Sequence, residues 1–161
     1  MIEFLPATLL EYIIAFTRLA AMTFGVPIAL VSLVDLDRQW FKSRSGLAAS
    51  ETPRSISFCT HAVEARELLV IEDAALDPRF ANNPLVTGEP RIRFYAGQPV
   101  YSDGQAIGTL CLIDRVPRTF DAAQRQVLKD LAELVEVELN HTRAVTARML
   151  ATCDGQIYET A

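Results

Sequence analysis

Apolar residues near the start of the chain recur at helical spacing. The stripe consists of Leu9, Ile13, Phe16 and Ala20. These residues are three or four positions apart, which places them on one face of an α-helix. Gly25 follows the stripe, and glycine commonly occupies the position just after the last helical turn. The pattern predicts a helix over residues 7–24.

The next segments have the patterns of paired strands. Residues 28–35 are apolar and rich in β-branched side chains, and residues 39–46 show the alternation of a half-exposed partner strand. A second pair, residues 93–101 and 105–114, flanks an Asp-Gly dipeptide. Asp-Gly between two alternating apolar runs is the strongest short-range hairpin signal. The sequence therefore predicts two antiparallel hairpins.

Shorter elements are predicted in the middle of the chain. Residues 47–56 form a predicted loop, after which Ser57 can cap a short helix over residues 58–66. A short strand follows at residues 68–73. Residues 74–88 are rich in Asp, Asn and Pro, and irregular segments of this length are usually functional or contain short helices.

The chain ends in a long predicted helix. Asp121 and Gln124 have the spacing of a capping box. No glycine or proline interrupts the sequence from there to about Met149, where the helix is predicted to end. Because the strands come as hairpins, the sheet should be antiparallel, and helices at the two chain ends can cover one of its faces. The order of elements therefore predicts an α+β domain.

Composition argues against several classes of protein. The 161 residues are half apolar and carry a net charge of −5 with no basic block, which is typical of one folded domain and not of a nucleic-acid-binding protein. The three cysteines lack CxxC spacing, which argues against a disulfide framework or a zinc site. Charged residues, glycine and proline interrupt the apolar runs near the N-terminus. We therefore expect a cytoplasmic protein with no membrane span and no metal.

Four collinear segments give the chain a family resemblance. They are FGVPIALVSLVDLDRQWFKSRSGL, TPRSISFCTHAV, DPRFANNPLVTGEPRIRFYAGQPV and DGQAIGTLCLIDRVPRTFDAAQ. Together they resemble the GAF domains that precede diguanylate cyclase or sensor histidine kinase modules in bacterial signalling proteins. The resemblance covers about residues 5–142, and residues 143–161 are expected to continue the last helix and end in a short tail.

The resemblance implies a fold and a role. The implied fold is α+β, with a central antiparallel sheet of five or six strands, the N- and C-terminal helices on one face and a small-molecule pocket on the other. The implied role is to sense a small molecule and to regulate an output cyclase, phosphodiesterase or kinase through dimer helices. The domain itself is then not an enzyme. The sequence specifies neither the ligand nor a cofactor.

Candidate pocket residues gather around the segment RSISFCTHAV. They are Phe41, Phe58, Cys59, His61, Arg79, Phe80, Phe94, Tyr95, Thr109 and Cys111. Strand alternation places Thr109 and Cys111 on one face of the last strand, and we expect this face to line the pocket because the opposite face carries alanine and glycine suited to helix contact. Alternation sends only one of Phe94 and Tyr95 toward the pocket and does not say which.

Other functions stay open as alternatives. Cys59 and His61 superficially resemble the attachment site of bilin-binding members, in which the Cys-His pair lies later in the domain. Cys59 and Cys111 can approach each other if the short helix covers the last hairpin, as the two thiols of a free methionine-(R)-sulfoxide reductase would. A ligand-free dimerisation module is the third alternative. Each thiol can instead be a small buried hydrophobe, which the apolar strand around Cys111 favours. Arg79 can pair with a carboxylate of the protein or of a ligand.

The last helix carries more apolar surface than one contact requires. Its main stripe consists of Leu128, Leu131, Val135 and Leu139, and beside it lie Val127, Leu134 and Val137. This breadth predicts a homodimer through the Leu128–Leu139 stripe. A helix covered on two sides within one monomer is the alternative.

Overall fold

Six strands form one antiparallel sheet. The computed structural model describes the backbone of residues 5–157 and the side chains of residues 11–141, 143–148, 150 and 151. Within these residues the strand order is β3-β2-β1-β6-β5-β4, and every pairing is antiparallel. The strands are β1 (Ile28–Val34), β2 (Arg38–Ser45), β3 (Glu51–Pro53), β4 (Leu69–Ile71), β5 (Phe94–Ser102) and β6 (Gln105–Asp114). The predicted α+β fold with two antiparallel hairpins is confirmed.

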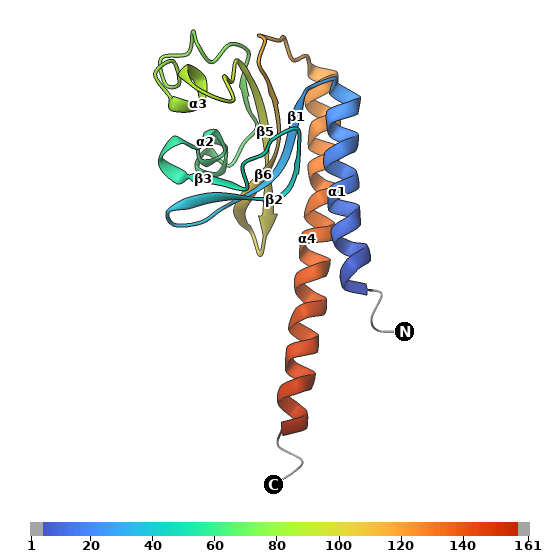
Figure 1. The fold of residues 1–161 in the computed structure, drawn as a ribbon. Helices are drawn as coiled ribbons and strands as arrows, with labels where there is room; N and C mark the ends of the chain where they lie inside the picture. Colours follow the sequence, from blue (N-terminus) through green and yellow to red (C-terminus); the bar gives the residue numbers. More distant parts are fainter. Residues whose placement is uncertain (1–4, 158–161) are drawn as a thin grey trace.

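Two long helices cover one face of this sheet (Figure 1). Helices α1 (Leu5–Phe24) and α4 (Ala122–Ile157) lie side by side in opposite directions, and α4 continues past the start of α1 and away from the sheet. The other face carries the 3₁₀ turn η1 (Arg54–Ile56) and the short helices α2 (Phe58–Ala65) and α3 (Pro84–Thr87). No helix within residues 5–157 is both long and apolar enough to cross a membrane.

Both predicted helix caps are present. The Ser57 hydroxyl accepts a hydrogen bond from the backbone N–H of Thr60 at 3.2 Å. At the start of α4, Asp121 accepts from the backbone N–H of Gln124, and the Gln124 side chain accepts from the backbone N–H of Asp121. These caps satisfy N–H groups that have no partner inside the helix.

Two boundary predictions were wrong. Residues 47–56 are not only a loop, because Glu51–Pro53 pairs with β2 as the edge strand β3 and η1 follows it. A three-residue strand is too short to show a period, and proline is tolerated at a sheet edge. Helix α4 continues beyond Met149 to Ile157, since a single glycine at position 155 weakens a helix without ending it. Residues 158–161 of the predicted tail lie outside the described residues.

The space between the sheet and the long helices is filled by apolar side chains. Alternate residues of β5 and β6, among them Phe94, Leu110 and Leu112, pack here against α1 and α4. The α4 contribution consists of Leu128, Leu131 and Val135, which are buried, and Leu139, which packs at the edge. The predicted dimer stripe therefore packs in the core of the monomer, because this side of α4 faces the sheet. The apolar α4 residues that stay exposed include Val127, Leu134 and Val137.

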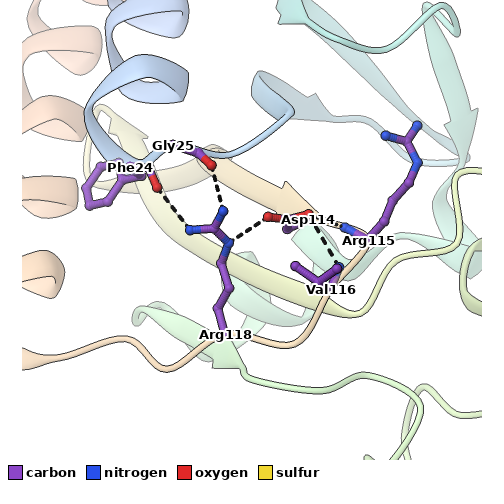
Figure 2. Close-up of polar contacts among 6 residues, drawn as sticks. All are labelled: Phe24, Gly25, Asp114, Arg115, Val116 and Arg118. Carbon is purple, nitrogen blue, oxygen red and sulfur yellow. Dashed lines mark hydrogen bonds and ion pairs between the residues drawn. The ribbon is translucent and has the colours of Figure 1, made fainter.

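One arginine joins the end of the sheet to the end of α1 (Figure 2). The Nε atom of Arg118, in the loop after β6, lies 2.6 Å from the carboxylate of Asp114, which is buried. Its two terminal nitrogens donate to the carbonyl oxygens of Phe24 and Gly25, at 3.1 and 2.6 Å. Carbonyls at a helix C-terminus lack partners within the helix. Arg118 therefore caps α1 and ties it to the last residue of β6.

Candidate functional site

A cavity of about 420 Å³ lies on the face of the sheet opposite the long helices. Strands and α2 supply its inner walls, and loops supply its rim. The sheet and α2 contribute Leu30, Gln39, Phe41, Phe58, Cys59, Tyr95 and Ile113. The β3 region, α3 and the loops contribute Leu47, Ala49, Thr52, Leu85, Glu89, Ile92 and Arg115, among others. The cavity is thus mainly apolar, with few polar groups.

Hydrogen bonds at the start of α2 join this helix to the neighbouring strands β2 and β3. The Ser57 hydroxyl donates to the side-chain oxygen of Gln39 on β2. The Gln39 amide nitrogen in turn donates to the Thr52 hydroxyl on β3, at 3.2 Å. Because Phe58 and Cys59 come directly after this anchor, they are held in the cavity wall.

Three predicted pocket residues do not line the cavity and lie behind its wall residue Phe58. Phe80 is fully buried and stacks on Phe58 with ring centroids 4.3 Å apart. The exposed ring of His61 lies edge-on to Phe80 at 4.8 Å, and the Arg79 guanidinium lies 5.2 Å from the same ring. Arg79 also binds Asp77 with two contacts of 3.0 and 2.7 Å, which lower the pKa of Asp77. Arg79 is therefore paired within the protein.

Strand alternation separates Phe94 from Tyr95. Tyr95 lines the cavity, whereas Phe94 faces the helix layer and packs against Phe120. Phe94 is therefore misplaced among the candidate pocket residues, because neighbouring residues of a strand point to opposite faces. The Tyr95 side chain lies over Gly97, where a Cβ atom would come within 2.1 Å of the Tyr95 hydroxyl. Glycine at position 97 makes room for this ring.

A cluster of thiols and hydroxyls lies at the base of the cavity. The Cys59 sulfur is 3.8 Å from the Cys111 sulfur, which confirms that α2 brings the two cysteines together. The Ser32 hydroxyl donates to the Cys59 sulfur at 3.0 Å, and the Tyr95 hydroxyl donates to it at 3.2 Å. The Thr109 hydroxyl lies 3.1 Å from that of Ser32. Thr109 and Cys111 are on the cavity side of β6, as alternation predicts, but they lie behind Cys59.

The cluster makes the two thiols unequal in acidity. Burial raises the pKa of the Cys59 thiol, but hydrogen bonds to its sulfur outweigh burial and lower the pKa to about 6. The groups that make these bonds are Cys111, Ser32, Thr109 and Tyr95. The pKa of Cys111 is raised because its thiol bonds to Cys59 and is buried. Cys59 is therefore the more acidic thiol.

The rim of the cavity is connected to the Arg118 junction. Arg115 lines the rim, and its Nε atom donates to the carbonyl oxygen of Pro90 at 3.0 Å. Its backbone N–H donates to the Asp114 carboxylate at 2.6 Å. The Arg115 side chain points away from the Asp114–Arg118 ion pair (Figure 2). One short segment therefore contacts both the cavity and the capping arginine of α1.

Several lining residues were missed by sequence reasoning. Ile113 shares a strand face with Cys111, and Leu30 is paired with Cys111 in the sheet, so alternation and register are signals that point to both. Leu85 lies in the four-residue helix α3 and Glu89 in the loop after it, and no periodicity in the sequence fixes the position of either. Among the side chains that the structure describes, no three His, Cys, Asp or Glu residues lie close enough to hold a metal ion.

A curated relative shares much of this sequence. A cyclic di-GMP phosphodiesterase from Pseudomonas aeruginosa is 47% identical over 131 residues. The aligned region is 78% of this chain and 22% of that protein. The chain therefore spans about a fifth of the length of this relative.

Solved structures with the same fold include a reductase and a GAF domain. The free methionine-R-sulfoxide reductase from Neisseria meningitidis superposes with a TM-score of 0.71 at 21% identity, over 85% of this chain and 81% of that one. The GAF domain of a phosphoenolpyruvate-protein phosphotransferase from Coxiella burnetii gives a TM-score of 0.72 at 17% identity, over 86% of each chain. At these identities the structures show a shared fold. Residues 8–139 also match the family model of the GAF domain, and the chain belongs to this family.

Proposed function

We propose that this GAF domain senses a small molecule in the cavity and regulates an output module. The observation that carries the proposal is the contrast between the two faces of the sheet. The helix side is filled by side chains, whereas the other side encloses about 420 Å³. Small-molecule sites are typically concave, mostly apolar and about 300–1,000 Å³ in volume.

The lining favours a ligand with an apolar body and a polar end. Leu30, Phe58 and Ile113 provide apolar surface at the sheet. The charged residues Glu89 and Arg115 lie at the rim. A ligand that enters with its apolar part first keeps its polar group beside these charges, where hydrogen bonds can fix its orientation.

A route from the cavity to the helices supports a regulatory role. A ligand that contacts Arg115 acts on a residue bonded through its backbone to Asp114, and Asp114 binds the Arg118 side chain that caps α1. A ligand shifts such an arrangement only by its difference in affinity between two states. We therefore expect the position of α1 relative to β6 to differ between the free and the bound domain.

The regulated signal is proposed to pass through a homodimer of the long helices. Val127, Leu134 and Val137 of α4 are exposed, as are Tyr12, Ile14 and Leu19 of the neighbouring α1. Exposed apolar side chains on adjacent helices suit a second copy of the domain. Sedimentation equilibrium should show a dimer that Leu134→Arg dissociates. Leu36→Arg, at an exposed turn far from these helices, is the matched control and should leave the dimer intact.

The relative from Pseudomonas aeruginosa supports the class of output. Its name describes a cyclic di-GMP phosphodiesterase, and this chain matches about a fifth of its length. This likeness supports a phosphodiesterase as the output, and our proposal covers a cyclase, phosphodiesterase or kinase in the cytoplasm. The domain acts as the sensory part and does not catalyse the output reaction.

A thermal-shift screen with a blocked cavity tests the ligand proposal. Ala49→Trp places a large ring at the rim of the cavity, where it can block entry, and Ala147→Trp makes the same change on the exposed surface of α4. Metabolites that raise the Tm of the wild type should also raise that of Ala147→Trp, and should leave Ala49→Trp unchanged. A metabolite shift that survives in Ala49→Trp contradicts binding in this cavity. A broad metabolite library with no stabilising compound contradicts the sensing role.

One observation favours a second candidate function. The contact between Cys59 and Cys111 supplies two thiols beside a cavity, as a reductase of free methionine-(R)-sulfoxide requires. The discriminating measurement is consumption of free methionine-(R)-sulfoxide in the presence of a thiol donor. Repeated turnover that Cys59→Ser and Cys111→Ser abolish supports this enzyme, and its absence leaves the sensory function.

A further inference from the structure

The paired cysteines are more than two buried apolar side chains. Cys59 comes from α2 and Cys111 from the central strand β6, and their sulfurs lie 3.8 Å apart. A disulfide holds two sulfurs about 2 Å apart, so bond formation requires a closure of about 2 Å. Because α2 is a short helix on the surface of the sheet, a small movement of this helix can provide that closure.

The two thiols differ in access and in hydrogen bonding. Cys59 lines the cavity, whereas Cys111 is fully buried behind it. The hydroxyls of Ser32 and Tyr95 both donate to the Cys59 sulfur. Donors aimed at one sulfur stabilise its thiolate, and the thiolate is the reactive form of cysteine. A small oxidant that enters the cavity therefore meets the more activated thiol first.

We propose that Cys59 and Cys111 form a peroxide-responsive dithiol, in which Cys59 is oxidised and Cys111 completes a disulfide. The Cys59 thiolate attacks one oxygen of hydrogen peroxide, the O–O bond breaks, and the departing hydroxide takes up a proton to give water. Cys59 is then a sulfenic acid.

The second step involves only groups already in contact. The Cys111 sulfur attacks the Cys59 sulfur, an S–S bond forms, and the S–O bond breaks. The hydroxide that leaves combines with the Cys111 thiol proton as a second water. In sum, the two thiols lose two protons and two electrons, and one peroxide becomes two waters. A dithiol reductant reverses the change by thiol–disulfide exchange.

The disulfide would change the base of the cavity. It joins α2 covalently to β6 and turns the Cys59 thiolate, which accepts hydrogen bonds from Ser32 and Tyr95, into an uncharged disulfide sulfur that accepts more weakly. The domain would then receive an oxidative signal as well as a ligand. Oxidation itself requires no cavity ligand, so this proposal and the proposed sensing of a metabolite can fail independently.

The main test uses the full chain with Cys153→Ser, which leaves two thiols. The reduced protein is treated with hydrogen peroxide, unfolded in the presence of an alkylating reagent, and weighed by mass spectrometry. We expect a monomer that has lost two hydrogens, has no alkylated thiol, and gives a Cys59–Cys111 linked peptide after proteolysis. Dithiothreitol should restore both thiols. Two alkylated thiols, or oxidation no faster than that of the same chain in denaturant, overturn the proposal.

Trapping with dimedone, which reacts with sulfenic acids, tests the order of the steps. In Cys111→Ser the adduct should form on Cys59, and in Cys59→Ser no adduct should form on Cys111. Dimedone present during oxidation of the two-thiol chain gives the same information without a core substitution, since it should label Cys59 alone. Labelling of Cys111 in preference to Cys59 contradicts the assigned order.

A matched pair of serine variants tests the role of the donors. Ser32→Ala removes the hydroxyl that lies 3.0 Å from the Cys59 sulfur and should slow peroxide oxidation severalfold. Ser43→Ala changes a buried serine on the neighbouring strand β2, whose hydroxyl has no partner in the described part of the chain. It should oxidise at the wild-type rate. Equal rates for Ser32→Ala and Ser43→Ala would show that the hydroxyl donors do not activate Cys59.

Discussion

The two faces of the sheet are built from the same strands but are covered differently. On β6, Leu110 and Leu112 pack into the helix-side core, whereas Cys111 and Ile113 belong to the cavity side. Alternation on a single strand therefore supplies both environments. The faces differ in what covers them, and the cavity side also carries the more polar strand residues, among them Ser32 and Thr109.

The covering elements explain why only one face is filled. The long helices α1 and α4 present apolar stripes to the sheet. The cavity side is covered by α2, of eight residues, by α3, of four, and by irregular segments. Short elements cannot align apolar side chains over the whole sheet, so space remains between them. The cavity therefore follows from the short length of the elements that cover this face.

Truncating one leucine on each face should produce the largest difference. Leu112→Ala removes a fully buried side chain from the filled core and should destabilise the protein by about 2–5 kcal/mol, because a new void forms. Leu30→Ala should cost about 2 kcal/mol, near the lower end of that range, since Leu30 already borders the cavity. Urea denaturation measures both losses. Equal losses, or a larger loss for Leu30→Ala, would contradict the contrast between the faces.

The junction between the faces should show an intermediate effect. Arg118→Ala removes the partner of the buried Asp114 and the cap of α1, and should lower the free energy of unfolding by about 1–3 kcal/mol. Arg91→Ala, whose 3.4 Å contact with Glu89 is exposed, is the matched control and should change it by less than about 0.5 kcal/mol. Similar losses for the two variants would show that the junction is an ordinary surface contact.

The smallest effect concerns reactivity and leaves the fold intact. The rate at which methyl methanethiosulfonate modifies Cys59 should rise with pH around a midpoint near 6, as the thiolate forms. The titratable groups that face Cys59 are Cys111 and Tyr95, and burial and contact with Cys59 raise the pKa of each. Modification can be followed by mass spectrometry of the Cys153→Ser chain. A midpoint near the ordinary thiol pKa of about 8.5 would show that the Cys59 thiol is not activated.

Local signals in the sequence predicted most of the fold. Alternation, the Asp-Gly turn and the caps at Ser57 and Asp121 identified the two hairpins and the start of each helix that they cap. The edge strand β3 was missed because three residues show no period. The stripe of α4 predicted to form the dimer packs in the core of the monomer instead, because the strongest apolar stripe of an amphipathic helix faces its own core.

The candidate site could be predicted only in part. Alternation correctly placed Cys111 and Thr109 on the cavity side of the sheet, yet it could not choose between Phe94 and Tyr95 without knowing which face each occupies. From the sequence, Arg79 could pair with a carboxylate of a ligand or of the protein, and in the structure it forms two hydrogen bonds to Asp77. The positions of rim residues such as Glu89 depend on the tertiary packing of an irregular segment, which no local sequence pattern predicts.

A crystal structure under xenon pressure tests the contrast between the faces most directly, because xenon enters apolar cavities that are empty of other atoms. The account predicts xenon density beside Leu30, Phe58 and Tyr95, and none between the sheet and the long helices. Side chains collapsed into the cavity without xenon, or xenon bound on the helix side, would contradict it.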